Sequence, residues 1–206
     1  MRILILGGDG YLGWPTAMHF ARTGHEVHAI DDYLRRRAHQ EAGTDSLTPI
    51  GPSLPTRAEA FRKVTGLEIG VTEGDLTDWS VVERLFREFE PEAIVHYGEM
   101  PSAPYSMIDR DHAVFTQTNN VVNTLNVLYA MAELAPDAHL VKLGTMGEYG
   151  TPNIDIEEAT SRSSTTGVRT RCRSPSSRAR CTTCPRSTTR TTSTSRAASG
   201  GFGPPT

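Results

Sequence analysis

Three glycines spaced three residues apart could hold a phosphate group near the start of the chain. Gly7, Gly10 and Gly13 form a GxxGxxG motif directly after the apolar run of residues 2–6. A pyrophosphate needs backbone N–H donors at the N-terminus of a helix and no Cβ atom in its way, so glycines suit such a turn. Turns also use glycine routinely, so the motif alone does not decide between a phosphate site and a structural turn.

An acidic pair follows the motif at the distance that a dinucleotide site requires. Asp31 and Asp32 lie 18 and 19 positions after Gly13, at the end of a second apolar run. A carboxylate there can accept from the adenosine ribose hydroxyls and would repel a 2′-phosphate, which favours NAD over NADP. Three arginines at residues 35–37 weaken this preference. Together, the motif and the pair predict a dinucleotide site.

Strands and helices are expected to alternate around these residues. Short apolar runs predict buried strands, and segments with helical periodicity separate them. The alternation predicts an α/β fold with a Rossmann-type, doubly wound parallel sheet. The interval 33–57 is polar and contains proline, so it is expected to be loop with some helix. The expected strands are residues 2–6, 26–30, 67–71, 93–96 and 139–143, and the expected helices are residues 11–23, 79–89 and 108–134.

Three segments resemble one enzyme family. They are residues 7–14 (GGDGYLGW), 102–110 (SAPYSMIDR) and 140–158 (LVKLGTMGEYGTPNIDIEE). They closely resemble the UDP-sulfoquinovose synthase family of extended short-chain dehydrogenase/reductases, and the resemblance covers residues 1–158. It implies an NAD-binding Rossmann domain over 1–158 and, in the family, a smaller C-terminal sugar-nucleotide domain.

The resemblance also implies a reaction. The family converts UDP-glucose and sulfite to UDP-sulfoquinovose, the head-group donor of sulfolipid. Tightly held NAD oxidises C4 of the glucose, the 4-keto group acidifies the C5 proton, and the 6-hydroxyl is eliminated. Sulfite, free or from a sulfite-donating protein, adds at C6, and hydride returns to C4. The intact family member is expected to be a homodimer.

Matched positions imply the site residues. Thr145 resembles the family's catalytic threonine, although a strand-end threonine bonded to backbone is the alternative. Tyr105 and Met146 resemble the lining of the sugar site. Without the family, Asp75 would be interpreted as a helix cap and Asn119 as a polar helix residue. The expected cofactor contacts are Gly7, Gly10, Tyr11, Leu12, Gly13, Asp31, Asp32, Arg35, Arg36, Asp75, Leu76, Gly98 and Asn119.

Two departures from the family affect catalysis. Met100 and Pro101 stand where the family carries Gln-Arg, which removes an arginine from the edge of the active site. The family also needs a Tyr-x-x-x-Lys pair, in which the tyrosine acts as acid and base on the C4 hydroxyl and the lysine lowers its pKa. No such pair occurs in the 206 residues, whose last tyrosine is Tyr149 and last lysine Lys142. Weak or no catalysis is therefore expected.

Residues 159–206 differ from the rest in composition. All 24 acidic residues precede them, and they contain nine arginines, 22 serines or threonines and all three cysteines. Such a segment buries too little apolar surface to offset its chain entropy, so a disordered, low-complexity tail is expected. Three cysteines without a histidine are one ligand short of a zinc site, so no metal is expected. Arginines with a single aromatic residue, Phe202, do not indicate a nucleic-acid surface.

A shift of reading frame accounts for this composition. If one G is missing from a glycine codon at position 159, the tail's permitted codons decode to a continuation of the same family. That continuation contains YHLSK, the missing Tyr-x-x-x-Lys pair, encoded around residues 181–186 (CTTCPR). The expectation is an incomplete Rossmann domain over 1–158 and an out-of-frame tail over 159–206.

Three functions remain open at this level. The first is a defective fragment of a UDP-sulfoquinovose synthase. The second is another NAD-dependent sugar-nucleotide epimerase or dehydratase, and the third is a non-catalytic NAD-binding module. The N-terminus lacks the pattern of a signal peptide and no apolar run approaches 18 residues, so a cytoplasmic protein without a membrane partner is expected.

Overall fold

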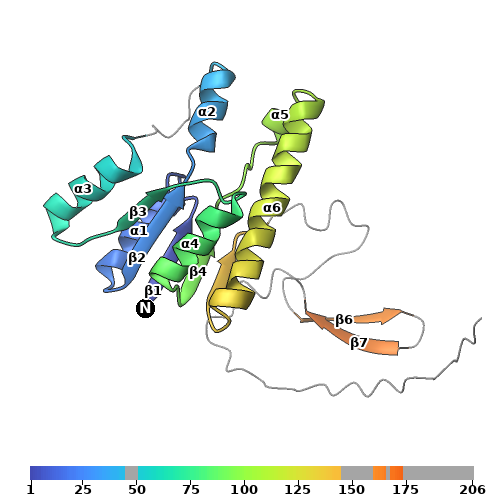
Figure 1. Ribbon diagram of the computed structural model, residues 1–206. Helices are drawn as coiled ribbons and strands as arrows, with labels where there is room; N and C mark the ends of the chain where they lie inside the picture. Colours follow the sequence, from blue (N-terminus) through green and yellow to red (C-terminus); the bar gives the residue numbers. More distant parts are fainter. Residues whose placement is uncertain (45–50, 145–159, 166–167, 174–206) are drawn as a thin grey trace, which may run out of the picture. The chain divides into compact units, whose positions relative to one another are not determined.

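A computed structural model describes residues 1–44, 51–144, 160–165 and 168–173 (Figure 1). The chain divides into two units, Met1–Asn153 and Ile154–Thr206. The first unit contains every predicted cofactor contact, and the second contains a short ribbon of two strands.

The first unit is built on a five-stranded parallel sheet. Its strands are β1 (Arg2–Leu6), β2 (Glu26–Asp31), β3 (Gly70–Glu73), β4 (Ala93–His96) and β5 (His139–Lys142). They are arranged in the order β3-β2-β1-β4-β5, and every neighbouring pair is parallel. The chain runs outward from β1 to β3 and then returns past β1 to β4. This order confirms the predicted Rossmann-type sheet and places its point of reversal between β1 and β4.

Helices cover both faces of the sheet (Figure 1). The helices of the described residues are α1 (Gly13–Arg22), α2 (Leu34–Glu41), α3 (Leu54–Thr65), α4 (Trp79–Phe89), α5 (Ala103–Ser106) and α6 (Arg110–Leu134), of which α1, α3, α4 and α6 pack on the sheet. Helices α1 and α3 supply one buried cluster, and α4 and α6 supply another. The sheet is therefore doubly wound, as the alternation of strands and helices predicted.

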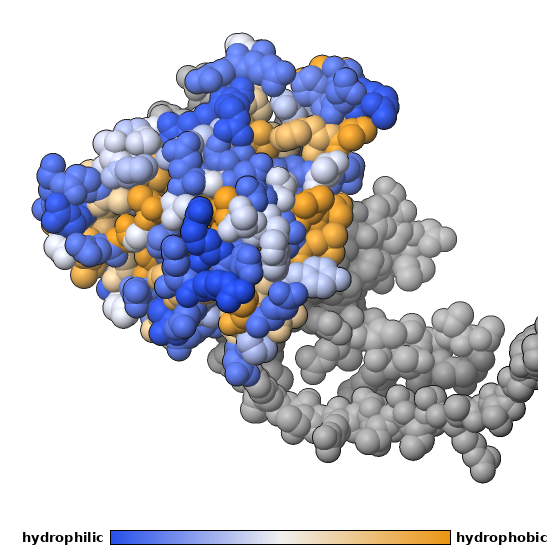
Figure 2. Space-filling view, in the orientation of Figure 1, coloured by the Kyte–Doolittle hydropathy of each residue, from blue (hydrophilic) through white to orange (hydrophobic). Residues whose placement is uncertain are grey.

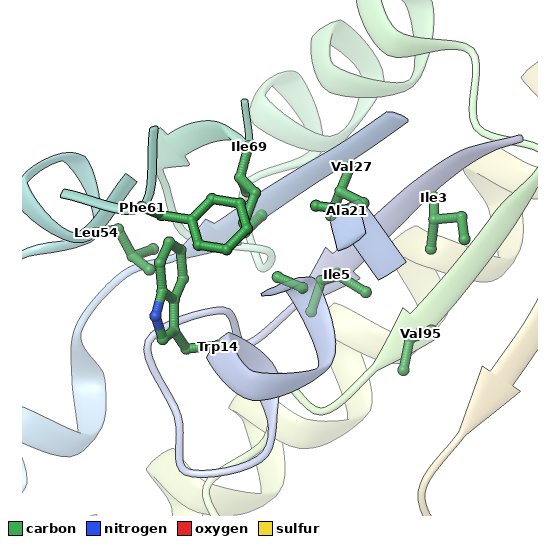
Figure 3. Packing of buried hydrophobic residues seen from close by; sticks show 11 residues of the cluster. Ile3, Ile5, Trp14, Ala21, Val27, Leu54, Phe61, Ile69 and Val95 are labelled. Atoms are coloured by element: carbon green, nitrogen blue, oxygen red, sulfur yellow. The ribbon is translucent and has the colours of Figure 1, made fainter. Parts of the chain in front are cut away.

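One core lies between the sheet and helices α1 and α3. Ile3 and Ile5 of β1 share this cluster with Trp14 of α1 and Phe61 of α3. The Trp14 and Phe61 rings meet edge to face, with centroids 6.5 Å apart (Figure 3). Leu54, which is 1% exposed, starts α3 in the same cluster. These contacts hold α3 against the sheet.

The other core lies on the opposite face. Leu4 and Leu6 are fully buried there, packed with Val82 and Phe86 of α4 and Val127 of α6. Successive residues of a strand point to opposite faces, so four consecutive apolar residues of β1 supply both cores. The central strand thus joins the two layers of helices.

Several elements differ from the sequence expectation, among them α5, which was not expected, and α2, which lies in the interval expected to be loop with some helix. Helix α3 occupies 54–65, which begins inside the interval expected to be mainly loop, and β3 lies at 70–73 instead of 67–71. Pro55 in the first turn and Gly66 at the C-cap, with φ +73°, are sequence features typical of the two ends of a helix, and they mark the ends of α3. Strand β3 is an edge strand of the described sheet, so its position depends on pairing with β2 more than on an apolar run.

The second unit contains β6 (Thr160–Thr165) and β7 (Val168–Arg173), paired antiparallel. Composition predicted a disordered tail, and within it the structure describes only these two paired segments. Threonine and valine favour extended backbone, and pairing between neighbouring segments closes only a short loop. Residues 174–206, which hold the Cys181 and Cys184 pair, lie outside the described residues.

We expect Val82→Ala to lower the free energy of unfolding by about 2–3 kcal/mol, because the side chain is fully buried and loses two methyl groups. Val64→Ala in α3 is the matched control, because Val64 is 85% exposed, and it should change stability by less than about 0.5 kcal/mol. Urea unfolding followed by circular dichroism measures both. Equal losses in the two variants would contradict the packing of α4 on the sheet.

Candidate nucleotide-binding site

A cavity of about 290 Å³ opens beside the carboxyl ends of β1, β2 and β4. It lies at the point where the strand order reverses, which is where open α/β sheets bind their ligands. Of the thirteen residues predicted to contact the cofactor, the following twelve line it: Gly7, Gly10, Tyr11, Leu12, Gly13, Asp31, Asp32, Arg35, Asp75, Leu76, Gly98 and Asn119.

The turn between β1 and α1 requires glycine at two positions. A Cβ atom at Gly13 would lie 2.0 Å from the carbonyl oxygen of Gly7. Gly7 has φ +83°, and a Cβ there would lie 2.7 Å from the carbonyl carbon of Tyr97. The N–H groups of Gly7 and Gly8 both donate to the carbonyl of Ile30 at 2.9 Å, which ties the turn to the end of β2. The chain therefore passes close under the cavity without a side chain in the way.

Helix α1 begins at this turn. Gly10, Tyr11, Leu12 and Gly13 all line the cavity. No side chain in the described part of the chain caps the helix at Leu12. The N–H of Trp14 donates to the Gly10 carbonyl at 3.4 Å and Pro15 has no N–H, so an anionic partner, which the helix dipole favours, would be met by the N–H groups of residues 11–13.

Asp31 ends β2 with both carboxylate oxygens bonded to backbone. Its Oδ2 accepts from the N–H of Asp9 at 2.9 Å, and its Oδ1 accepts from the N–H of Tyr33 at 2.7 Å. Burial raises the pKa of Asp31 to about 6, and these two N–H bonds oppose the rise. A carboxylate held in this way keeps lone pairs for further hydroxyl donors.

The three consecutive arginines have different positions. Arg35 lines the cavity. Arg36 was also predicted to contact the cofactor, but it is not among the lining residues, and its Nε bonds Asp9 Oδ2 at 2.8 Å. Arg37 pairs with Asp32, Nη2 to Oδ2, at 2.7 Å. Asp9 itself lines the cavity. It was not among the predicted cofactor contacts, because its arginine partners lie 27 and 48 residues away in the sequence.

Hydrogen bonds fix two cavity residues of the loop after β3, one through a partner in the same loop and the other through a partner on α6. Asp75 Oδ1 accepts from both the N–H and the hydroxyl of Thr77 at 2.8 Å, as a loop aspartate before a helix often does. The carbonyl of Leu76 accepts from Asn126 Nδ2 at 2.9 Å. A Cβ at Gly98 would lie 2.9 Å from Leu76 Cδ1, so this wall is closely packed.

Asparagines of α6 fix the loop that follows β4. Asn123 Nδ2 donates to the carbonyl of Gly98 at 2.6 Å. Asn120 bonds both backbone groups of Met100, accepting from its N–H at 2.8 Å and donating to its carbonyl at 3.1 Å. Asn119 and Asn123 line the cavity from one face of the helix. Only Asn119 was predicted, although the spacing of four residues would have indicated Asn123 as well.

Of the residues predicted for the sugar side, Tyr105 lies in the described part of the chain, and it is not among the residues that line this cavity. The Tyr105 hydroxyl donates to Glu41 Oε2 at 3.5 Å, and its ring packs edge to face against His112, with centroids 4.7 Å apart. These contacts place Tyr105 between α2 and α6 instead of on the cavity wall. Thr145 and Met146 lie outside the described residues.

The described residues contain neither a cluster of metal-ligating side chains nor a membrane-spanning helix. No group of three or more His, Cys, Asp or Glu side chains within them could hold a metal ion. None of the helices in that part of the chain is long and apolar enough to cross a membrane.

Comparison with known protein families agrees with this geometry. The family model described as the NAD dependent epimerase/dehydratase family matches residues 3–172. The chain belongs to this family. The match covers the five-stranded sheet from Ile3 onward, the helices that pack on it and the residues that line the cavity.

Within the NAD dependent epimerase/dehydratase family, the chain is similar to two UDP-sulfoquinovose synthases. The chloroplastic enzyme of Spinacia oleracea is 51% identical over 157 residues, which are 76% of this chain and 32% of that protein. The enzyme of Sulfolobus acidocaldarius is 48% identical over 159 residues, which are 77% of this chain and 40% of that protein. The chain thus spans less than half the length of these relatives.

Solved structures of epimerases share the fold. UDP-glucose 4-epimerase from Bifidobacterium longum, in complex with NAD⁺ and UDP, has a TM-score of 0.58 at 22% identity, over 75% of this chain and 40% of that one. WbmG of Bordetella bronchiseptica, in complex with NAD, has a TM-score of 0.52 at 28% identity, over 75% of this chain and 40% of that one. These matches agree with the parallel sheet and its covering helices.

We expect the stability difference between the wild type and Asp31→Asn to depend on pH. The folded-state pKa of about 6 lies above the reference value of 3.8, so the favourable contribution of Asp31 is complete below about pH 3.8 and is lost as pH rises through 6. The free energy of unfolding of the wild type, relative to the variant, should fall by roughly 2–3 kcal/mol between pH 4 and pH 7. Urea unfolding across this range measures the difference, and a flat profile would contradict the burial of this carboxyl.

Proposed function

We propose that this chain carries the NAD-binding part of a UDP-sulfoquinovose synthase. The observation that carries the proposal is the cavity at the reversal of strand order, lined by twelve of the thirteen residues expected to contact the cofactor. Identity near one half to two UDP-sulfoquinovose synthases supports the specific reaction.

The residues of the cavity fit NAD. Gly7 and Gly13 leave no space for side chains where a pyrophosphate would approach, and the start of α1 offers N–H donors. Asp31 can accept from the ribose hydroxyls, and those donors would offset the cost of ionising a buried carboxyl. Asp75 and Leu76, on the wall nearest β3, suit the adenine, with one polar and one apolar contact. When bound, NAD supplies a reversible acceptor for hydride from C4 of the sugar.

The proposed substrates are UDP-glucose and sulfite, the latter free or carried by a donor protein. Thr145 is proposed as the catalytic threonine near the sugar, and Tyr105 and Met146 as residues of the sugar side. Met100 and Pro101 line the cavity in place of the family's Gln-Arg. Differences from the relatives are therefore expected in the handling of sulfite or of the UDP-sugar.

We further propose that residues 159–206 are out of frame and that this 206-residue form binds NAD without turnover. The support is the missing Tyr-x-x-x-Lys pair, without which no group is placed to exchange a proton with the C4 hydroxyl. The second candidate function is a related sugar-nucleotide epimerase or dehydratase, which membership of the NAD dependent epimerase/dehydratase family allows.

We also propose that the intact protein is a homodimer through α6. Val114, Val121, Leu125 and Leu128 are each 45–52% exposed on this helix, on the side opposite the buried Val127. Figure 2 shows hydrophobic side chains gathered along α6. Their spacing of three, four and seven residues forms a stripe of the kind that packs against another helix.

The enzymatic proposal is tested by expressing two genes, one as given and one with a G restored at codon 159. We expect both products to bind NAD in calorimetry, and only the restored product to form UDP-sulfoquinovose from UDP-glucose and sulfite, as detected by mass spectrometry. Thr145→Ala in the restored protein should lower turnover without loss of NAD binding. Turnover by the 206-residue chain would contradict its proposed inactivity, and UDP-galactose formed without sulfite would favour the epimerase.

The dimer proposal predicts that Val121→Glu in the restored protein gives a monomer, because a charge would be buried in the apolar stripe. Glu133→Lys, a charge change on an exposed position of the same helix away from the stripe, is the control and should leave the dimer intact. Light scattering after size-exclusion chromatography measures the mass. A wild-type monomer, or a Val121→Glu dimer, would refute the role of α6.

A further inference from the structure

A carboxylate in the glycine turn binds two arginines that approach it from different helices. We propose that Asp9 determines cofactor specificity, because it holds Arg36 and Arg57 away from the ribose side of the cavity and so keeps the site selective for NAD over NADP. This inference rests on the proposed NAD-binding function. The sequence alone leaves the preference between NAD and NADP open, because three arginines at 35–37 lie just after the acidic pair at 31–32.

The Asp9 side chain is 5% exposed and has charged partners on both oxygens. Arg36 of α2 binds it with two nitrogens, Nη2 to Oδ1 at 2.5 Å and Nε to Oδ2 at 2.8 Å. Arg57 of α3 also donates to Oδ1, and it donates to the Asp9 carbonyl at 3.4 Å. A bidentate pair of this kind is among the strongest charge-assisted hydrogen bonds in proteins.

Both guanidiniums are also held by the backbone of the segment before α3. Arg36 donates to the carbonyls of Gly51 and Pro52 at 2.9 and 3.0 Å, and Arg57 Nε donates to that of Pro52 at 2.9 Å. The Arg36 guanidinium lies over the ring of Tyr33, 5.0 Å from its centroid. These contacts hold the two guanidiniums against the segment before α3 and the ring of Tyr33.

The cluster adjoins the place where a 2′-phosphate would lie. The N–H of Asp9 donates to Asp31 Oδ2, the carboxylate proposed to hold the ribose hydroxyls. Asp9 and Asp31 line the cavity, whereas Arg36 and Arg57 do not. The charges of Arg36 and Arg57 are thus paired with Asp9 within the protein, whereas Arg35 lines the cavity. Arginine is the side chain best suited to bind a 2′-phosphate, so its release would change the preference.

The test is Asp9→Asn, which keeps the shape of the side chain and one acceptor but removes the charge. Binding of NAD and of NADP is measured by calorimetry at fixed salt for the full chain and the variant. We expect the ratio of the Kd for NADP to the Kd for NAD to fall about tenfold, the order expected for one new charge-assisted hydrogen bond. A purely structural loosening of the turn would weaken both cofactors and leave this ratio unchanged.

Adding Arg36→Gln to Asp9→Asn should reverse the gain, because it removes the released guanidinium. If Asp9→Asn does not fold by circular dichroism, Arg36→Gln alone decides the question. The ratio should then stay within about twofold of the wild type, because the effect of removing a guanidinium already held away from the ligand is small. A tenfold loss of NADP binding relative to NAD in that variant would show that Arg36 already faces the phosphate, and would overturn the proposal.

The outcomes separate the two claims. A wild-type chain that binds neither cofactor contradicts the proposed function itself. A wild type that binds NAD, with the ratio unchanged in a folded Asp9→Asn variant, contradicts only the role of Asp9.

Discussion

The contact between two glycines is the constraint on which the rest of the structure depends. Gly13 lies so close to the carbonyl of Gly7 that no side chain fits between them. This approach lets α1 start six residues after β1 and pack on the sheet, which brings Trp14 into the core. The same approach keeps side chains of Gly7 and Gly13 out of the cavity that they line. The cavity is thus a direct result of the way the first helix packs.

The site is coupled to the fold through α2 and α3, the two helices between β2 and β3. Arg36 and Arg57 reach from these helices to Asp9, and the guanidinium of Arg57 also lies over the ring of Trp14, 5.5 Å from its centroid. The ring of Trp14 in turn meets Phe61 of α3. Two contacts therefore hold α3: the ion pair between Arg57 and Asp9 beside the cavity, and the contact between Phe61 and Trp14 in the core.

Sequence reasoning succeeded where local pattern decides the structure. The bounds of β1, α4 and β4 follow from apolar runs and helical periodicity, and all three match the prediction. The residues of the glycine turn and of the acidic pair were also predicted to lie at one site, and they line one cavity. Asp9 and Asn123, which line it too, were not predicted, and Arg36 is not among the lining residues, since the positions of these side chains depend on partners 22 to 48 residues away.

The placement of the two tryptophans makes the doubly wound sheet observable by spectroscopy. The chain contains two tryptophans, Trp14 in the cluster beneath α3 and Trp79 against the cluster beneath α4 and α6. Each indole therefore reports on one layer of helices. Replacing either one with phenylalanine leaves a chain whose emission follows a single face of the sheet. Comparing the fluorescence of the two single-tryptophan variants during unfolding would show whether the helices on the two faces leave the sheet together or one face after the other.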